Sequence, residues 1–385
     1  MFEDSTPPAE PRDQESQGWD NTGAQPWPEV SIIIPVYNAE QELVRCLASI
    51  EAQDYPVSQL HILVIDDDSI DRTREVAREH GAMVLRNGHK NIERGKSIGL
   101  AHAQSEFILL IDSDNRLPRA DWLRLAVTAL IEHPDVVGAQ AAWFAYDRRD
   151  PPANRYCSLF GIGDPVAYYL RRQDHLSHLD TDWTLSGQIV ERAPTHFLVR
   201  FTPQTMPTVG SQGFLTRKSL LLQTNWSPAL FHVDSNLQLV AAGHDLYALL
   251  RCEVTHDYVR SIAHLSGKLH RNARLFYSQQ ATREHVWTMS TSTIALSLLK
   301  MVTVVIPLHD AWRGYRRLRD PAWFIHPILC VFVPVMYAYV WVQWRLRVLG
   351  RGNGWSRRAP MARQGERRQH VAMPTTEQVS AEVEQ

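Results

Sequence analysis

The chain has 385 residues, which allows about two domains of ~150 residues each and excludes a disulfide-stapled miniprotein. Apolar residues make up 44% and charged residues 21%, the composition of a folded chain, and the net charge of −2 argues against a protein that coats nucleic acid. The cysteines are widely spaced without a CxxC pair, which excludes a zinc ribbon or a disulfide framework and favours a reducing compartment. They are Cys46, Cys157, Cys252 and Cys330.

The first 28 residues are predicted to be a disordered acidic tail. They are rich in proline, glutamine, serine and acidic residues, and they lack the basic and apolar regions of a signal peptide. From Val30 onward, short apolar runs begin that are rich in β-branched residues, as is typical of buried parallel strands. The runs cover residues 31–36, 60–65 and 107–111.

Helical patterns separate these apolar runs. Residues 40–52 place Leu43, Leu47 and Ile50 on one face, and residues 71–80 form a second pattern that Gly81 would close as a C-cap. Strands that alternate with helices predict a doubly wound α/β sheet.

Polar residues follow each predicted strand, where ligands bind in such sheets. Asp112 and Asp114 come directly after the third run and could converge on a divalent cation, because hard carboxylate oxygens suit Mg²⁺ or Mn²⁺ beside a diphosphate. An Asx turn or a helix cap is the simpler explanation of an isolated pair. The acidic run 66–68 after the second strand favours a functional site, since capping needs only one acid.

The polar motifs together resemble family 2 glycosyltransferases. They occur in the family's order within residues 30–120: SIIIPVYN at 31–38, QDYP at 53–56, VIDDDSIDRT at 64–73, GKSIGL at 95–100 and LIDSD at 110–114. The resemblance implies a GT-A fold, a nucleotide-diphospho-sugar donor and transfer with inversion of the anomeric centre. A P-loop is excluded, because Lys90 stands where its first glycine would be.

The resemblance also implies roles for individual residues. Pro35, Tyr37 and Asp67 would hold the nucleobase with Asp66 beside them, and Lys96 would lie near the nucleotide. Asp112 and Asp114 match the motif for the metal and the diphosphate. Asp68 departs from the family, which more often has Gly or Asn at this position, and this leaves the base preference open.

Inversion requires a base that removes the proton of the acceptor hydroxyl. The candidate is Asp234, because residues 210–218 and 231–244 are similar to the acceptor-side segment of the family, where a Glu-Asp pair precedes a helix. Val233 replaces that Glu. The alternative is that Asp234 only caps a helix over 235–242.

A basic cluster follows in the sequence. His264, Arg271 and Arg274 are candidates for contacts to the diphosphate or to an anionic acceptor, and a solvated helix face is the alternative. Residues 280–284 resemble the QxxRW element of processive synthases, but Glu284 stands where Trp belongs, which disfavours a processive polymerase.

The C-terminal part contains two apolar stretches, 286–308 and 321–344, and the second is long enough to span ~30 Å of hydrocarbon. Residues 345–368 carry eight arginines, which favours retention of the tail in the cytoplasm. We therefore expect membrane association, either as a hairpin or as in-plane segments, and a buried core subdomain is the alternative.

The predicted organisation is a tail over 1–28, a glycosyltransferase domain over 29–284, apolar membrane-associated helices over 285–345 and an Arg-rich, then disordered, tail over 346–385. The domain would divide into a nucleotide-sugar half at 29–125 and an acceptor half at 126–284. The expected activity is metal-dependent transfer of a sugar to a glycan, lipid-linked or other hydroxyl acceptor at the cytoplasmic face of the cell membrane. An inert nucleotide-sugar-binding scaffold is the alternative, and a nucleotidyltransferase a more distant one.

Overall fold

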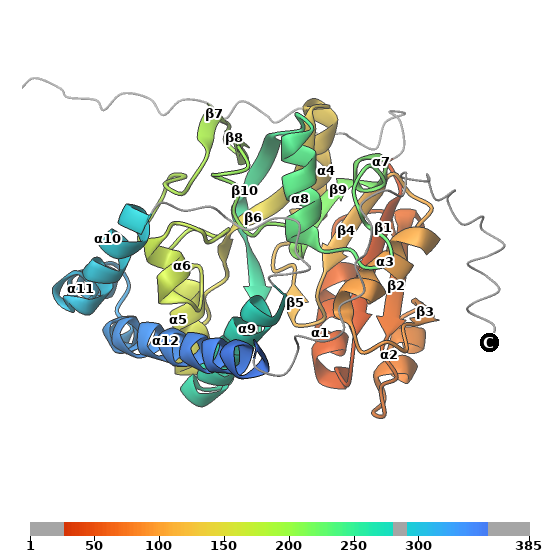
Figure 1. The fold of residues 1–385 in the computed structure, drawn as a ribbon. Coiled ribbons are helices and arrows are strands. Elements are labelled where there is room, and N and C mark those ends of the chain that lie inside the picture. Colours follow the sequence, from red (N-terminus) through yellow and green to blue (C-terminus); the bar gives the residue numbers. More distant parts are fainter. Residues whose placement is uncertain (1–26, 280–290, 353–385) are drawn as a thin grey trace, which may run out of the picture.

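A computed structural model describes residues 27–279 and 291–352. Residues 1–26 of the predicted tail over 1–28, residues 353–385 of the predicted tail over 346–385 and the segment 280–284 lie outside the described residues. The described part is built around a ten-stranded mixed sheet (Figure 1). Its strands are β1 (Val30–Val36), β2 (Leu60–Asp66), β3 (Met83–Arg86), β4 (Phe107–Ile111), β5 (Asn115–Arg116), β6 (Val136–Phe144), β7 (Gln188–Arg192), β8 (His196–Arg200), β9 (Gln212–Arg217) and β10 (Leu246–His256).

The strand order is β3-β2-β1-β4-β9-β6-β10-β8-β7, with β5 paired to the end of β10. The strands β3, β2, β1 and β4 run parallel, and β9 is antiparallel to both of its neighbours. The predicted strands over 31–36, 60–65 and 107–111 are confirmed as β1, β2 and β4. The predicted doubly wound mixed sheet is therefore also confirmed.

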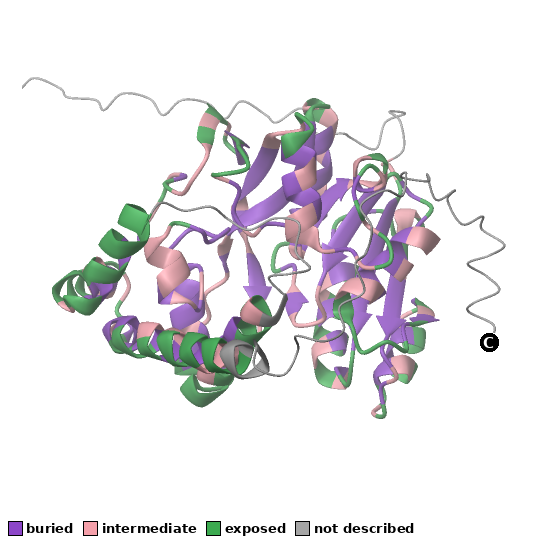
Figure 2. Ribbon diagram, in the orientation of Figure 1, coloured by how far each residue is buried: buried purple, intermediate pink, exposed green. Residues whose placement is uncertain are grey.

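Helices cover both faces of the sheet, which explains why β1 is buried at every position and is apolar except for Ser31. Ile32 and Ile34 pack with α1 on one face, and Ile33 packs with α3 on the other. A Cβ atom at Gly99 of α3 would lie 2.5 Å from Ile33, so the close packing of this helix requires glycine. Burial is concentrated in the strands (Figure 2).

The first two helices confirm the predicted patterns, since α1 and α2 fall within 40–52 and 71–80. The α-helices before residue 262 are α1 (Glu40–Glu51), α2 (Thr73–Glu79), α3 (Ile92–His102), α4 (Trp122–Glu132), α5 (Pro152–Phe160), α6 (Pro165–Tyr169), α7 (Lys218–Leu221) and α8 (His232–Ala241). Those that follow are α9 (Ile262–Gln279), α10 (Thr291–Val302), α11 (Val305–Arg317) and α12 (Ile325–Gly352). Two short 3₁₀ helices are η1 (Val57–Gln59) and η2 (Pro321–Phe324).

The two apolar C-terminal stretches differ in structure. The first is broken into α10 and α11, which meet at 68°. The second forms η2 and α12, and Pro321–Arg347 is, within the described residues, the one helix that alone is long and apolar enough to cross a membrane. Leu329, Val333 and Met336 of α12 are buried in one cluster with residues of α5 and α9, so this helix packs along α5 and α9.

Candidate active site

Asp112 and Asp114 follow β4, where the chain turns toward the end of β10. Asn115 Nδ2 lies in the same turn, and the short strand β5 pairs antiparallel with the end of β10. The backbone N–H of Asp257 donates to the carbonyl of Asp114 at 2.8 Å. Residues 112–116 are thus held against the end of β10 by main-chain bonds, which keeps both carboxylates in place.

Lys96 links the first of these carboxylates to α3. Its side chain is buried, and its Nζ lies 3.7 Å from both Asp112 Oδ1 and Glu93 Oε2. Burial opposes a charge on Lys96, but the two carboxylates outweigh this effect and raise its pKa. Burial also raises the pKa of Asp112, against the effect of Lys96. Lys96 therefore remains a cation beside the expected diphosphate position.

His256 faces the second carboxylate, with its Nε2 3.6 Å from Asp114 Oδ2. Burial opposes ionisation of Asp114, but the charge and hydrogen bond of His256 outweigh it and hold the pKa of Asp114 below its usual range. Asp112 Oδ1 is buried without a hydrogen bond in the described structure. Such an oxygen, next to a second carboxylate and an imidazole, suits a divalent cation.

The described residues include no group of three His, Cys, Asp or Glu side chains placed to hold a metal ion by themselves. A cation at Asp112 and Asp114 would therefore need ligands from elsewhere, and the oxygens of a bound diphosphate are of the right kind. The residues present fit a metal that binds together with its nucleotide.

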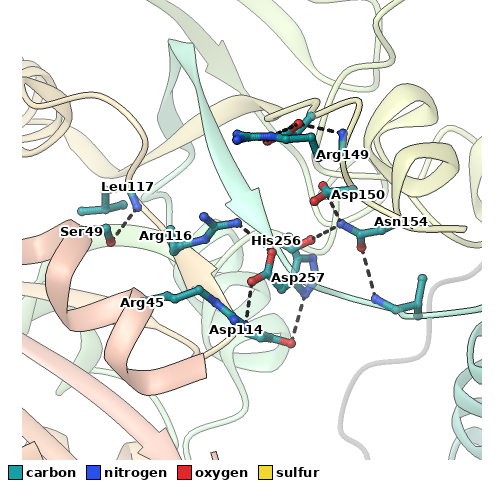
Figure 3. A network of polar contacts seen from close by, with 12 residues as sticks. Arg45, Ser49, Asp114, Arg116, Leu117, Arg149, Asp150, Asn154, His256 and Asp257 are labelled. Carbon is teal, nitrogen blue, oxygen red and sulfur yellow. Dashed lines mark hydrogen bonds and ion pairs between the residues drawn. The ribbon is translucent and has the colours of Figure 1, made fainter. Parts of the chain in front are cut away.

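A network of polar contacts around Asp257 lies next to Asp114 and His256 (Figure 3). Asp257 accepts from Arg116 Nη2 at 2.9 Å and lies 3.2 Å from Arg45 Nη2. Asn154 donates to the carbonyl of His256 at 3.1 Å. Because the network ties α1, β5, β10 and α5 together, it fixes the position of His256 relative to Asp114.

The acidic run after β2 shapes the expected nucleotide site. Asp67 Oδ1 accepts from the backbone N–H groups of His89 and Lys90 at 3.1 and 2.7 Å. Asp66 accepts from the N–H of Ser69 at 3.1 Å. Both aspartates therefore order the loops at this edge of the sheet, a role that the sequence did not indicate.

Tyr37 and Pro35 lie at the end of β1, at the same sheet edge. The side chain of Tyr37 is exposed, with 55% of the residue accessible, whereas Pro35 is covered by α3, where a Cβ at Gly95 would lie 3.3 Å from it. An exposed ring at a strand end is available to stack on a base.

Asp68 has a structural reason for its departure from the family. Its φ is +61°, the left-handed region that favours Gly or Asn, and Asp tolerates this region better than most residues. Arg86 Nε donates to Asp68 Oδ1 at 2.8 Å and holds the turn. The turn is therefore kept with a different side chain.

A cavity of about 1030 Å³ adjoins the aspartate pair. Its wall includes His256, which faces Asp114, and Glu93, which faces Lys96. From there it extends between α5, α6, α8, α9 and α10. This is the space next to the carboxylates in which an acceptor could bind.

Asp234 lies in the first turn of α8, partly exposed. The helix begins at His232 and its N-cap position is Phe231, so Asp234 is not the cap of a helix over 235–242, and that alternative is wrong. Asp234 is not among the described residues that line the cavity, whereas His232 and Val233 are.

The basic residues of α9 do not gather at the aspartate pair. His264 is exposed at the start of the helix, and Arg271 and Arg274 line a separate cavity of about 350 Å³ between α9 and α12. Lys268 is nearer the pair: it donates to the carbonyl of Tyr258 at 2.7 Å, and its pKa is lowered by burial against the attraction of Asp114.

Sequence reasoning missed His256, Glu93 and the Asp257 network. His256 ends the long strand β10, so the rule that polar residues at strand ends mark a site would have found it had this strand been recognised. Glu93 lies one turn before Lys96 on α3, a spacing that puts both on one helix face.

Comparison with known proteins gives a consistent result. Residues 31–220 match the model of the family described as glycosyl transferase family 2. Glycosyltransferase AglE of Haloferax volcanii is 29% identical over 138 residues, which are 34% of this chain and 45% of that protein. The poly(ribitol-phosphate) beta-N-acetylglucosaminyltransferase TarS of Staphylococcus aureus is 28% identical over 109 residues, 27% of this chain and 19% of its own.

Among solved structures, the mannosyltransferase PcManGT of Pyrobaculum calidifontis, in complex with GDP-Man and Mn²⁺, matches with a TM-score of 0.47 and 14% identity. The match covers 82% of this chain and 90% of that one. The chain spans less than half the length of the two curated relatives named above. The mixed sheet is the one that the family resemblance implied. By the match over residues 31–220, the chain belongs to glycosyl transferase family 2.

Proposed function

We propose that this protein transfers a sugar, with inversion, from a nucleotide-diphospho-sugar to a hydroxyl acceptor, and that it needs Mg²⁺ or Mn²⁺. The observation that carries the proposal is the pairing of Asp112 with Lys96 and of Asp114 with His256 beside the cavity. Family membership supports the reaction type, and the acceptor is a glycan, a lipid-linked molecule or another alcohol.

The donor would bind along the carboxyl ends of β1, β2 and β4. Tyr37 would stack on the base, and the loop that Asp67 holds would form the wall of the base pocket. Asp112 and Asp114 would hold the cation, which would supply positive charge beside the diphosphate leaving group. Lys96, buried and cationic, adds to this stabilisation from the protein side.

In the reaction the acceptor oxygen forms a bond to the anomeric carbon, and the bond from that carbon to the diphosphate oxygen breaks. The electron pair leaves with the nucleoside diphosphate, and the proton of the acceptor hydroxyl goes to a base on the opposite face. We assign this base to the first turn of α8. Asp234 is the residue indicated by the family pattern, and His232 is favoured by its position in the cavity wall.

Membrane association is proposed from the outer surface of the C-terminal helices. Much of α10, α11 and α12 is exposed (Figure 2). We name the exposed apolar side chains of these three helices the apolar platform. On α12 they recur every three or four residues, opposite the face that packs on α9: Ile328, Phe332, Val335, Tyr339, Val342 and Leu346. Because one face is packed on the domain, the helix would lie in the plane of the interface.

Cations border the platform, as expected for a surface on anionic lipid headgroups. Arg313, Arg316, Arg319 and Arg345 are exposed on α11, in the segment after it and on α12. The four buried, unpaired cysteines agree with a reducing compartment, and we place the protein at the cytoplasmic face of the cell membrane. There it would take part in the synthesis of envelope polysaccharide or glycolipid.

The test is metal-dependent turnover of a panel of UDP-, GDP- and dTDP-sugars, with Mn²⁺ or with chelator. Asp114→Asn should lower turnover about 100-fold or more, because it removes one anionic ligand, while the fold is kept. Asp135→Asn, an exposed aspartate outside the site, is the matched control. Wild-type protein that binds a nucleotide sugar with Mn²⁺ but never turns it over would instead establish the inert scaffold.

A further inference from the structure

The cavity beside the aspartate pair has two chemically different ends. The catalytic end is lined by Glu93, His232 and His256, and by Gln212 at the start of β9. The other end, which we name the apolar end, lies between α6, α9 and α10 and is lined mainly by Val166, Ala167, Leu269, Ala273, Phe276 and Ile294. One continuous space thus joins polar, reactive groups to hydrocarbon side chains.

The carboxylate at the apolar end is committed to internal bonds. Asp164 accepts from the N–H of Val166 at 2.8 Å, where it caps α6, and from the hydroxyl of Tyr337 on α12 at 2.6 Å. Burial raises the pKa of this carboxyl. The carboxylate oxygens of Asp164 are therefore used to join α6 to α12, and the surface around them is suited to an uncharged, apolar group.

The apolar end also reaches the outside at the apolar platform. Phe276 of α9 and Ile294 of α10 line the cavity, and each is 40% exposed. Ile294 is itself part of the platform that we place on the membrane. A molecule held in the bilayer could therefore pass its hydrocarbon chain into the cavity without crossing water.

The volume fits a ligand larger than one sugar. Pockets of about 300–1,000 Å³ hold complete drug-sized molecules, and this cavity of about 1030 Å³ is at the upper limit of that range. A water-soluble glycan would leave the apolar end filled with poorly bonded water, which costs affinity, whereas a hydrocarbon chain would bury both surfaces.

We propose that the acceptor is an amphiphile, a lipid with a hydroxyl-bearing headgroup, whose headgroup lies at the catalytic end and whose chain lies between α6, α9 and α10. This inference rests on the proposed function and selects among its acceptors. The headgroup hydroxyl would lie near His232 and the aspartate pair, and the chain would extend toward Ile294.

The experiment uses the full chain on vesicles of phosphatidylcholine and phosphatidylglycerol. The probe is a decyl β-glucoside with a photoreactive diazirine at the end of its chain, and labelled residues are mapped by mass spectrometry. Labelling is expected on Ala167, Ala273 and Ile294. Unlabelled decyl β-glucoside should compete with the probe, whereas methyl β-glucoside, which has the same headgroup and no chain, should not.

Ala273→Phe fills the apolar end and should lower cavity labelling on the order of tenfold, because about two methylene groups of the probe's hydrocarbon chain would no longer be buried. Ala263→Phe is the matched control, since Ala263 lies on the same helix but is exposed. Ala167→Phe repeats the test from α6 if the first variant has a lower melting temperature. Labelling confined to the outer faces of α11 and α12, unchanged in the filled variants, would overturn the proposal.

The two proposals fail in different ways. If no nucleotide sugar is turned over with Mn²⁺ but cavity labelling follows the expected pattern, the glycosyltransferase function is wrong and the lipid site remains. If turnover depends on Asp114 but labelling does not depend on Ala273 or Ala167, the glycosyltransferase function stands and the acceptor is not held by a hydrocarbon chain.

Discussion

The nucleotide half and the acceptor half of the molecule use charge differently. In the nucleotide half, Asp66 and Asp67 at the end of β2 accept backbone N–H groups at fixed positions. In the acceptor half, the cavity has polar groups at one end, and its remainder is lined by helices far apart in the chain. On the proposed function, donor recognition would depend on short-range geometry at strand ends and acceptor choice on helix packing, so the acceptor could vary without disturbing the donor site.

The largest expected effect tests the proposed base in the first turn of α8, within the acceptor half. If Asp234 is the base, Asp234→Asn should lower kcat by ~10²–10⁴ with little change in donor affinity. If His232 is the base, His232→Gln should show this loss instead and Asp234→Asn should not. Transfer rates and nucleotide affinities of both variants decide between them, and a loss in neither excludes this turn as the source of the base.

Removal of a strand-end carboxylate tests whether the nucleotide half works through its loop. Asp67→Ala should weaken nucleotide binding by about 1–3 kcal/mol, because the N–H groups of His89 and Lys90 lose their acceptor. Asp68→Asn, which removes the charge that pairs with Arg86 and keeps a residue that tolerates the φ of +61°, is the comparison. Calorimetry that gives equal affinities for the two variants would contradict a special role of Asp67.

The contact between the halves at the proposed metal site should have an intermediate effect. His256→Gln removes the imidazole that faces Asp114, and we expect Mn²⁺ affinity in the presence of nucleotide to fall about 10–100-fold. His133→Gln, away from this site, should leave it unchanged. Titration of Mn²⁺ against nucleotide-bound protein measures the effect, and an unchanged affinity would show that Asp112 and Asp114 suffice.

The smallest effect concerns stability of the acceptor half as the pH changes. His326 of α12 is buried between the hydroxyls of Tyr156 and Tyr169, and burial lowers its pKa to about 3. In the unfolded chain the pKa of this side chain is near 6.5, so on acidification the unfolded state binds a proton at His326 before the folded state does. The contribution of neutral His326 to folding stability is therefore complete above pH ~6.5 and is lost as the pH falls toward 3.

His326→Gln should therefore lose less stability on acidification. The difference between the unfolding free energies of wild type and His326→Gln should shrink by about 1.4 kcal/mol per pH unit below pH ~6. His89→Gln, at an exposed position, should run parallel to wild type. Denaturant unfolding between pH 7 and 5 measures the slopes, and equal slopes for wild type and His326→Gln would contradict the burial effect.

The sequence allowed most of the nucleotide half to be predicted, because its signals are local. The alternation of strands and helices and the positions of Asp112 and Asp114 follow from patterns within about ten residues. The acceptor half was less accessible. His256 meets Asp114 only through the pairing of β5 with β10, and the bend between α10 and α11 occurs at Val304, a β-branched residue with φ +61° that no propensity favours.

The packing of α12 bears on how a water-soluble form of the protein could be prepared. Trp323, Leu329 and Val333 form one hydrophobic cluster with Tyr156 and Phe160 of α5. A chain shortened before α10 would lose part of its own interior and expose these aromatic rings, so it should aggregate during expression. Replacing the outward-facing apolar residues of α12 with polar ones removes the exposed hydrophobic surface and keeps the hydrophobic cluster buried.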